Sequence, residues 1–381
     1  MDQMIHDQCK IKVLYDYLPF VGTYGGVPRY LCEILVEMKD RIEIEMSVLY
    51  SDNEYAKQLP FLKIPHLFTK NNFKGKSKLE GIINLIYSSQ KIIRNNYDIF
   101  HATCSNAYIL GYSNASYLKH IKKPFVATIH DMIYENAPAD YQEVYAIHIE
   151  SKKRLIYGSD HIIAVSENTK KEILKFYPIN PEKITVIHHG NPTVSQVKLQ
   201  NEFGKYILFV GRRSPYKNFP FFTESIAPLL LNDNQLKLVC VSPSFTIEEE
   251  KFLVKLGIRN QVITIGGVSD VRLNSLYKNA LVFAFPSLEE GFGLPILEAF
   301  ANNCPVCLSN SSCFPEIAGN AGLYFDPKDK LSIHNTVKRI VNDKPLALEL
   351  ARLGSERLEL FSWKKAAQQT LEVYNLLHNF L

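Results

Sequence analysis

Short, almost continuously apolar runs alternate with longer segments of helical period along most of the chain. Such runs are typical of strands buried on both faces of a parallel sheet, and the alternation predicts right-handed βαβ units. The predicted strands are Lys12–Tyr15, Ile42–Leu49, Ile99–His101, Phe125–Ile129, His161–Val165, Ile184–Ile187, Tyr206–Val210, Leu236–Val241, Val262–Ile265, Leu281–Phe285, Pro305–Leu308 and Gly322–Phe325. The predicted helices are Val27–Lys39, Leu79–Asn95, Tyr141–Gly158, Glu167–Phe176, Asn218–Leu231, Ile247–Gly257, Ser269–Asn279 and Leu294–Asn302.

The alternation breaks once, between Gly190 and Gly204, and the sequence after Asp326 is helical. At 381 residues the chain is long for a single core. We therefore expect an N-terminal domain over residues 1–195, a second domain over 196–360, and a C-terminal helix, 361–381, that packs on the N-terminal domain. The predicted fold class is α/β, with two Rossmann-like, doubly wound domains facing each other across a cleft.

Composition and charge further limit the class of protein that the sequence can encode. The chain is 46% hydrophobic and 22% charged, and its net charge of +4 is too small to indicate a nucleic-acid partner. No apolar run approaches the roughly 18 residues of a membrane span, and no signal peptide is visible at the start, so we expect a cytoplasmic protein. Seven cysteines are an odd number, and most lie in apolar surroundings, as reduced thiols do: Cys32, Cys104, Cys240, Cys304 and Cys307.

A glycine-rich loop follows the predicted strand that ends at Phe285, and Pro295 fits the first turn of the next helix. Loop amides and a helix N-terminus suit a phosphate or a sugar oxygen. Glu290 and Glu298, with seven residues between them, bracket this site. A carboxylate can accept two hydrogen bonds from a vicinal diol, so the segment suits a ligand with a sugar at each end of a phosphate. The alternative is a charged loop followed by a solvated helical glutamate.

A second candidate follows the first strand of the second half. Gly211 allows close approach of the backbone, and Arg212 and Lys217 can converge on a diphosphate as a fork and a point charge. The alternative is a basic turn on the surface.

The N-terminal half carries its own glycine pair and a histidine at a strand end. Gly25 and Gly26 follow the first strand and open a helix, so the backbone there can approach a phosphate. The Gly-x-Gly-x-x-Gly fingerprint is absent, which disfavours a nicotinamide dehydrogenase. His130 and Asp131 end one strand and His101 ends another; a lone histidine at a strand end is most often a structural hydrogen-bonding group.

Together these elements resemble the family 4 glycosyltransferases, retaining enzymes of the GT-B class. The resemblance covers nearly the whole chain and includes the closing Phe361-Ser362-Trp363 segment. It implies that Arg212 and Lys217 hold the donor diphosphate. It also implies that Glu290 contacts the donor sugar and Glu298 the ribose. Further implied contacts are backbone amides at Phe292, Gly293 and Leu294, the Gly25-Gly26 backbone near the distal phosphate, His130 facing the donor sugar, and Asp131 and His101 on the acceptor side.

The resemblance predicts metal-independent, retaining transfer of a sugar, without a cofactor. The donor would be GDP-mannose or a UDP-sugar, and the acceptor a hydroxyl of a saccharide or a lipid-linked saccharide in bacterial surface polysaccharide synthesis. His130, Arg212, Lys217 and Glu290 would be the catalytic residues. The alternatives are a sugar-nucleotide epimerase or phosphorylase of the same fold, and a non-catalytic sugar-nucleotide-binding relative.

Two weaker patterns remain. Cys304 and Cys307 have redox or zinc spacing, but without a partner pair they are better explained as part of a buried strand, and we predict no metal site. Basic residues without acidic neighbours predict contact with an anionic membrane, at the inner face of the plasma membrane; the alternative is a mobile solvated loop. The stretch without Asp or Glu carries Lys63, Lys70, Lys74, Lys76 and Lys78, interleaved with Leu67, Phe68 and Phe73. Further positive charge in the same half comes from Lys122, Lys123, Lys152, Lys153 and Arg154.

Overall fold

The computed structural model describes residues 10–62, 64–65, 75–103, 108–109, 112–113, 118–194, 197 and 199–379. Its contacts divide the chain into two units. Unit 1 comprises Met1–His189 and Trp363–Leu381, and unit 2 comprises Gly190–Ser362. The division therefore falls after His189 and after Ser362, where the sequence suggested 195 and 360.

Unit 1 is built on a six-stranded sheet with the order β2-β1-β3-β6-β7-β8. All neighbouring strands in it are parallel. The strands are β1 Lys12–Tyr15, β2 Glu43–Met46, β3 Ile99–Ala102, β6 Phe125–Ile129, β7 His161–Ala164 and β8 Ile184–Val186. The chain runs outward in opposite directions from the β1/β3 pair, so this pair is the topological switch point, where open α/β sheets bind ligands.

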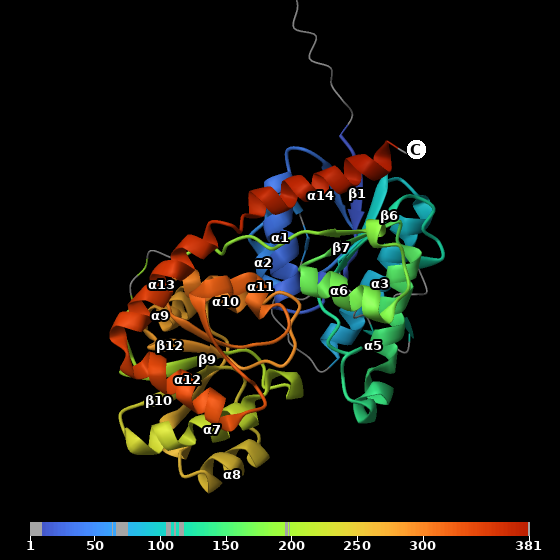
Figure 1. Ribbon diagram of the computed structural model, residues 1–381. Helices are drawn as coiled ribbons and strands as arrows, with labels where there is room; N and C mark the ends of the chain where they lie inside the picture. The colour runs from blue at the N-terminus through green and yellow to red at the C-terminus, as the bar shows by residue number, and fades with distance from the viewer. Residues whose placement is uncertain are drawn as a thin grey trace, which may run out of the picture. The chain divides into compact units, whose positions relative to one another are not determined.

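Helices flank this sheet, and the C-terminal helix returns to it. The helices are α1 Gly26–Met38, α2 Glu54–Lys57, α3 Lys76–Arg94, α5 Ala139–Gly158, α6 Glu167–Phe176 and α14 Trp363–His378. Ser166 caps α6 by accepting a hydrogen bond from the Thr169 N–H, as its position before the helix predicts. Figure 1 shows the red helix α14 beside the blue helix α1, against which it packs.

Unit 2 repeats the architecture with the order β11-β10-β9-β12-β13-β14, again all parallel. Its strands are β9 Tyr206–Val210, β10 Lys237–Val241, β11 Val262–Ile265, β12 Val282–Phe285, β13 Val306–Ser309 and β14 Gly322–Phe325. Its helices are α7 Phe219–Asn232, α8 Ile247–Lys255, α9 Asp270–Asn279, α10 Leu294–Ala301, α11 Phe314–Ala318, α12 Lys330–Asn342 and α13 Lys344–Leu358 (Figure 1). Here the switch point lies between β9 and β12, and α7 packs against α12.

The apolar runs formed strands as predicted, with bounds that agree to the residue for β1, β6, β9, β11 and β14. The run at 42–49 was overestimated because β2 ends at Met46. Beyond it, the side-chain amide oxygen of Asn84 accepts hydrogen bonds from the backbone N–H groups of Leu49 (2.8 Å) and Tyr50 (3.0 Å), in place of a neighbouring strand. The two-stranded hairpin of β4 Tyr108–Ile109 and β5 Tyr112–Ser113 was not predicted.

The cysteines of the described residues are buried free thiols: Cys32, Cys240, Cys304, Cys307 and Cys313. Burial raises the pKa of the Cys32 thiol to about 12, so it stays protonated at neutral pH. Cys307 lies in the buried strand β13, in agreement with the structural interpretation of the Cys304/Cys307 pair. Cys104 lies outside the described residues.

Two aromatic side chains of α14 belong to the core of unit 1. The Tyr374 hydroxyl contacts the Tyr15 hydroxyl (2.9 Å) and the Nδ1 atom of His101 (2.5 Å). Trp363 stacks on His189, with ring centroids 5.7 Å apart. Unit 1 is thus completed by residues that follow unit 2 in the sequence.

Replacing Tyr374 by Phe should destabilise unit 1, because it leaves a buried imidazole nitrogen and a buried hydroxyl without their partner. The expected loss in free energy of unfolding is about 1–3 kcal/mol. Trp363 is the only tryptophan and lies in unit 1, so urea unfolding followed by tryptophan fluorescence reports on this unit. Leu376→Ala, at a 48% exposed position of the same helix, is the control and should have little effect. Equal unfolding midpoints for Tyr374→Phe and wild type would contradict this account.

Candidate functional site

The two predicted donor-binding segments of unit 2 meet at its switch point. One follows β9 and the other follows β12, and these strands are neighbours in the sheet. A hydrogen bond from the Leu288 N–H to the Tyr216 carbonyl (2.7 Å) joins the two loops. The carboxyl ends of two parallel strands therefore place both motifs at one edge of the sheet, as expected.

Lys217 and Glu290 are in direct contact, with the ammonium group donating a hydrogen bond to the carboxylate. Both side chains are mostly buried, at 12% and 13% exposure. The Lys217 Nζ atom also lies over the ring of Phe285, 4.9 Å from its centroid. The cation and the anion that the sequence assigned to one ligand are thus neighbours.

Gly211 adopts a backbone conformation that favours glycine. Its φ of +133° is rare for residues with a side chain, and a Cβ atom there would lie 3.6 Å from Lys217 Cε and 3.7 Å from Nζ. A residue with a side chain would strain the backbone here, although its Cβ atom would make only ordinary van der Waals contact with Lys217. The glycine therefore serves the backbone turn that follows β9.

The adjacent arginines have different environments. Arg213 is held by Glu249 through two hydrogen bonds of 2.6 and 2.9 Å, and it stacks on Phe245 at 4.5 Å. Arg212 is exposed, and within the described part of the chain it has no ion pair. Arg212 is therefore the guanidinium that remains available for a ligand, which is the residue that the sequence singled out.

The loop that carries Glu290 is fixed by Ser312, which sequence reasoning missed. The Glu290 N–H donates to the Ser312 Oγ atom (3.0 Å), and the Ser312 hydroxyl donates to the Glu290 carbonyl (2.6 Å). Ser312 has a φ of +56°, unusual for a non-glycine residue. No spacing in the sequence marks it, because its contact joins loops that follow two different strands.

The segment after Glu290 ends at the start of α10. Phe292 is buried and packs its edge against Phe361, with centroids 5.9 Å apart. Gly293 has a φ of +89° and immediately precedes the helix, whose first residue is Leu294. A Cβ atom at Gly293 would lie 3.1 Å from Ile296 Cδ1, so glycine is needed both for the turn and for the space.

Glu298 lies on α10 and is only 8% exposed, so the alternative of a solvated helical glutamate was wrong. The Tyr277 hydroxyl donates a hydrogen bond to its Oε2 atom (3.0 Å). Tyr277 was not predicted from the sequence, because it comes from α9. The contact fixes the direction in which the Glu298 carboxylate points.

In unit 1, the glycine loop follows β1 and opens α1. Gly25 precedes the helix and Gly26 is its first residue. A Cβ atom at Gly25 would lie 3.2 Å from Cδ of Pro28, so the proline ring occupies the space that the glycine leaves. Asn53, which precedes α2, stabilises the glycine loop because its Nδ2 atom donates a hydrogen bond to the Gly22 carbonyl (2.7 Å).

His130 follows the last residue of β6 and is half-buried. Its Nε2 atom lies 2.9 Å from the Thr103 carbonyl oxygen, which can only accept a hydrogen bond, so Nε2 carries the proton. The pKa of the imidazole is lowered to about 4, mainly by burial and to a small extent by the charge of Lys152, while Asp131 and the Thr103 hydrogen bond oppose the shift. His130 is therefore neutral at pH 7, with Nδ1 as a hydrogen-bond acceptor.

Asp131 is half-exposed and belongs to a buried ionic cluster. Lys152 Nζ donates to the Asp131 carbonyl (2.8 Å) and to Oε2 of Glu135 (2.8 Å), and it lies 3.3 Å from Oδ1 of Asp131. Lys152 is 2% exposed. Its interpretation as a surface membrane contact was wrong: it holds the loop that follows His130.

His101 does not fit the predicted place on the acceptor side. It is 1% exposed. Its Nδ1 contacts the Tyr374 hydroxyl, and its Nε2 contacts the Thr128 hydroxyl at 2.8 Å. Burial, with a contribution from His130, lowers its pKa to about 3. Both nitrogens are thus occupied within the core, and His101 has a structural role.

The membrane hypothesis rests on residues that the structure only partly describes. Lys63, Lys70, Lys74, Leu67, Phe68 and Phe73 lie outside the described residues. Lys76 is 8% exposed and paired with Asp52 (2.5 Å), so it is not a free surface cation. Among the helices described, none is long and apolar enough to cross a membrane, and the described residues hold no cluster of three or more potential metal ligands.

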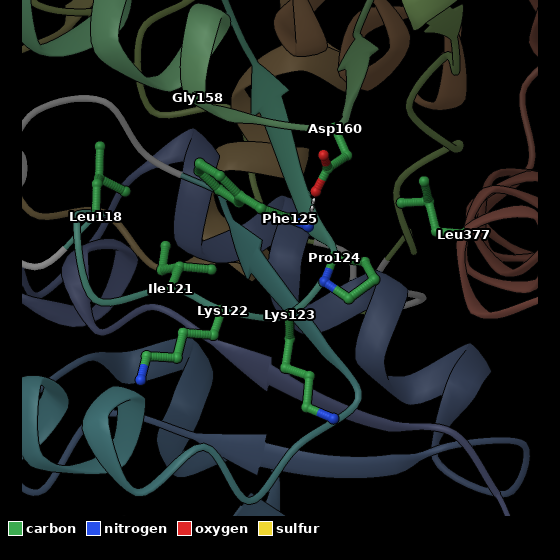
Figure 2. Close-up of a pocket in the computed structure, with 9 residues that line it drawn as sticks. All are labelled: Leu118, Ile121, Lys122, Lys123, Pro124, Phe125, Gly158, Asp160 and Leu377. Carbon is green, nitrogen blue, oxygen red and sulfur yellow. Dashed lines mark hydrogen bonds between the residues drawn. The ribbon is translucent and has the colours of Figure 1, made fainter. Parts of the chain in front are cut away.

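A cavity of about 570 Å³ lies in unit 1, but at the opposite edge of the sheet. Its lining includes Phe125, the first residue of β6, and Asp160, which precedes β7. Figure 2 shows the Asp160 carboxylate directed at the backbone nitrogen of Phe125, a contact of 2.8 Å. The cavity therefore belongs to the amino-terminal edge, whereas His130 follows the carboxyl end of the same strand.

Comparisons with known proteins agree with this architecture. Residues 24–193 match the family described as Glycosyltransferase Family 4, and residues 191–357 match Glycosyl transferases group 1. The chain is 25% identical to O-antigen chain mannosyltransferase B of Escherichia coli, over 96% of this chain and 100% of that protein. It is 31% identical to O-antigen chain mannosyltransferase RfbU of Salmonella typhimurium, over 56% of this chain and 60% of that protein.

Among solved structures, HepE of Anabaena, in complex with UDP and glucose, superimposes with a TM-score of 0.70 at 17% identity, covering 96% of this chain and 99% of that one. This likeness shows the GT-B fold. The two consecutive family matches and the mannosyltransferase relatives show the family. The chain belongs to the family 4 glycosyltransferases.

The buried imidazoles predict that unit 1 loses stability in acid. A histidine whose pKa falls from about 6.5 in the unfolded chain to about 4 in the folded state stabilises the fold fully above pH 6.5 and progressively less as the pH falls toward 4. We expect the free energy of unfolding, followed by Trp363 fluorescence, to decline over this range. The decline should be shallower in His130→Gln and unchanged in His120→Gln, which alters an exposed histidine. Parallel pH curves for His130→Gln and wild type would refute the assignment.

Proposed function

We propose that the protein transfers a sugar from a nucleotide-diphosphate sugar to a hydroxyl of a saccharide or lipid-linked acceptor, with retention of the anomeric configuration. The observation that carries the proposal is the contact between Lys217 and Glu290 beside the exposed Arg212, at the switch point of unit 2. A cation pair for a diphosphate and an acceptor for sugar hydroxyls are the groups that such a donor needs.

Donor binding would rearrange the ion pair. The diphosphate carries more negative charge than the single carboxylate that Lys217 contacts in this structure, so Lys217 would exchange Glu290 for phosphate oxygens. Glu290 would then accept hydrogen bonds from the donor sugar. Glu298, oriented by Tyr277, would accept hydrogen bonds from the ribose.

The chemical step breaks the bond between the anomeric carbon and the phosphate oxygen. Negative charge develops on that oxygen, and Arg212, Lys217 and the loop amides are fixed charges and dipoles that would stabilise it. The leaving phosphate would accept the proton of the attacking hydroxyl on the same face of the sugar. Neither carboxylate then has to act as a nucleophile, and no divalent metal is required.

His130 would contribute as a neutral hydrogen-bond acceptor. Because Nε2–H is bonded to the Thr103 carbonyl, only Nδ1 is left to accept a hydrogen bond from a hydroxyl of the donor sugar. Asp131, the next residue, would line the acceptor side. The backbone at Gly25 and Gly26 would approach the distal phosphate.

Two comparisons support different donors. The O-antigen mannosyltransferase relatives support GDP-mannose, and the UDP complex of HepE supports a UDP-sugar. The same relatives support a place in bacterial surface polysaccharide synthesis. A lipid-linked acceptor would bring the enzyme to the inner face of the plasma membrane.

The function is tested with a panel of UDP-, GDP-, dTDP- and ADP-sugars. The true donor at about 100 times its dissociation constant should stabilise the protein by about 2.7 kcal/mol, seen as a rise in melting temperature. The same donor should support transfer to a saccharide acceptor in excess EDTA. Loss of transfer in EDTA that Mg²⁺ restores would contradict the metal-free mechanism.

The same assays distinguish the alternative functions. Product formed without an acceptor would indicate an epimerase, and phosphate-dependent cleavage would indicate a phosphorylase. Binding without any reaction would indicate a non-catalytic relative.

Lys217→Ala and Glu290→Ala should each lower transfer by about a hundredfold or more, the loss expected for one preorganised contact. The paired variant Lys217→Met with Glu290→Gln separates catalysis from folding, because it removes both buried charges together. It should fold stably and remain inactive. Lys205→Ala, which breaks an exposed ion pair with Asp233 (3.7 Å) in the same unit, is the control and should keep full activity. Transfer near the wild-type rate in either single variant would remove the assigned roles.

A further inference from the structure

Asp16 is a buried carboxyl at the switch point of unit 1. It directly follows β1 and has no exposed surface. Its Oδ1 atom accepts hydrogen bonds from both the backbone N–H (3.0 Å) and the hydroxyl (2.9 Å) of Thr103, which directly follows β3. Because β1 and β3 are neighbours, the two contacts join the carboxyl ends of the strand pair at which open α/β sheets bind ligands.

This placement is costly for the fold. Within the described residues, Oδ2 of Asp16 has no hydrogen-bond partner, and no ion pair to Asp16 is found there. Burial of the carboxyl raises its pKa to about 7, against the opposing effect of the Thr103 hydrogen bonds. An apolar residue of similar size would avoid the cost of removing a carboxyl from water. What the aspartate provides in return is an acceptor for the buried N–H and hydroxyl of Thr103.

Thr103 connects this carboxyl to His130. The residue whose N–H and hydroxyl are held by Asp16 is also the one whose carbonyl accepts the Nε2–H of His130 (2.9 Å). Fixing the donor groups of Thr103 fixes the orientation of that residue, and with it the direction of its carbonyl oxygen. Sequence reasoning singled out His130 but neither Asp16 nor Thr103, which lie 87 residues apart.

We propose that Asp16 is a positioning residue: acting through Thr103, it fixes the ring orientation of His130 and keeps the imidazole proton on Nε2. Only the consequence for catalysis rests on the proposed function. With the proton on Nε2, Nδ1 presents a lone pair to a donor hydroxyl. Without the Asp16 contacts the Thr103 carbonyl is no longer held in line with Nε2, so the ring can turn or carry its proton on Nδ1.

The test compares Asp16→Leu, which removes the acceptor, with Asp16→Asn, which keeps an oxygen able to accept both Thr103 hydrogen bonds. Nitrogen-15 NMR of the imidazoles reports which nitrogen of His130 is protonated, and His130→Gln identifies its signals. We expect the Nε2–H form in wild type and Asp16→Asn, and a mixture of the two tautomers in Asp16→Leu.

Asp98→Leu is the matched control, since Asp98 accepts a hydrogen bond from the Lys12 N–H (2.8 Å) at the opposite end of the same strand pair. It should lower stability and leave the His130 tautomer unchanged. In transfer assays, Asp16→Leu should lower kcat by about tenfold, a barrier increase of about 1.4 kcal/mol, with the donor KM within about twofold. Binding of UDP or GDP alone should be unchanged, because Arg212 and Lys217 belong to unit 2.

A wild-type tautomer and wild-type kcat in folded Asp16→Leu would overturn the proposal. Should that variant fail to fold, Thr103→Val removes one of the two contacts, and it must then show a smaller shift in the same direction; an unchanged tautomer overturns the proposal equally. Where wild type transfers no sugar from any donor, the proposed function fails. The NMR comparison still decides the role of Asp16.

Discussion

Parallel pairing of the strands is the constraint on which the rest of the structure depends. A parallel ladder brings the carboxyl ends of all its strands to one edge, and the βαβ connections place a loop after each of them. Where the strand order reverses, two such loops have no helix packed between them. In unit 2 this occurs at β9 and β12, and Lys217 meets Glu290 there. In unit 1 it occurs at β1 and β3, and Asp16 meets Thr103 there.

The arrangement of the sheets was predictable because the signal is local. Most of the twelve strands are short apolar runs that are largely buried, and their lengths and spacing reveal them without any tertiary information. The strand predicted over Ile42–Leu49 was too long, because a contact with a residue distant in the sequence ends it early. There the side chain of Asn84, on α3, competes with strand pairing. The small hairpin at Tyr108–Ser113 has strands of only two residues, too short to show a period.

The candidate donor-site residues of unit 2 could be singled out from the sequence because motif chemistry concentrates in two loops. The residues that hold them could not. Ser312, Tyr277 and Thr103 act through contacts between segments that are distant along the chain. Lys152 was misread because a buried lysine and a surface lysine look the same in a sequence. Lys152 is buried because it pairs with two carboxylates, Asp131 and Glu135. These carboxylates come within reach only when α5 packs against the loop after β6.

The two switch points differ in how they treat charge. Unit 2 keeps charged groups and balances them, Lys217 against Glu290 and Arg213 against Glu249, and leaves Arg212 exposed. In unit 1, burial favours the neutral forms of Asp16 and His130, while the charged Lys152 is paired with Asp131 and Glu135. The diphosphate of the proposed donor would be attracted to the cations at the switch point of unit 2. In unit 1, the neutral imidazole of His130 would suit an uncharged hydroxyl, which it would recognise through the direction of a hydrogen bond. The two switch points thus differ in charge because burial and ion pairing differ within each sheet.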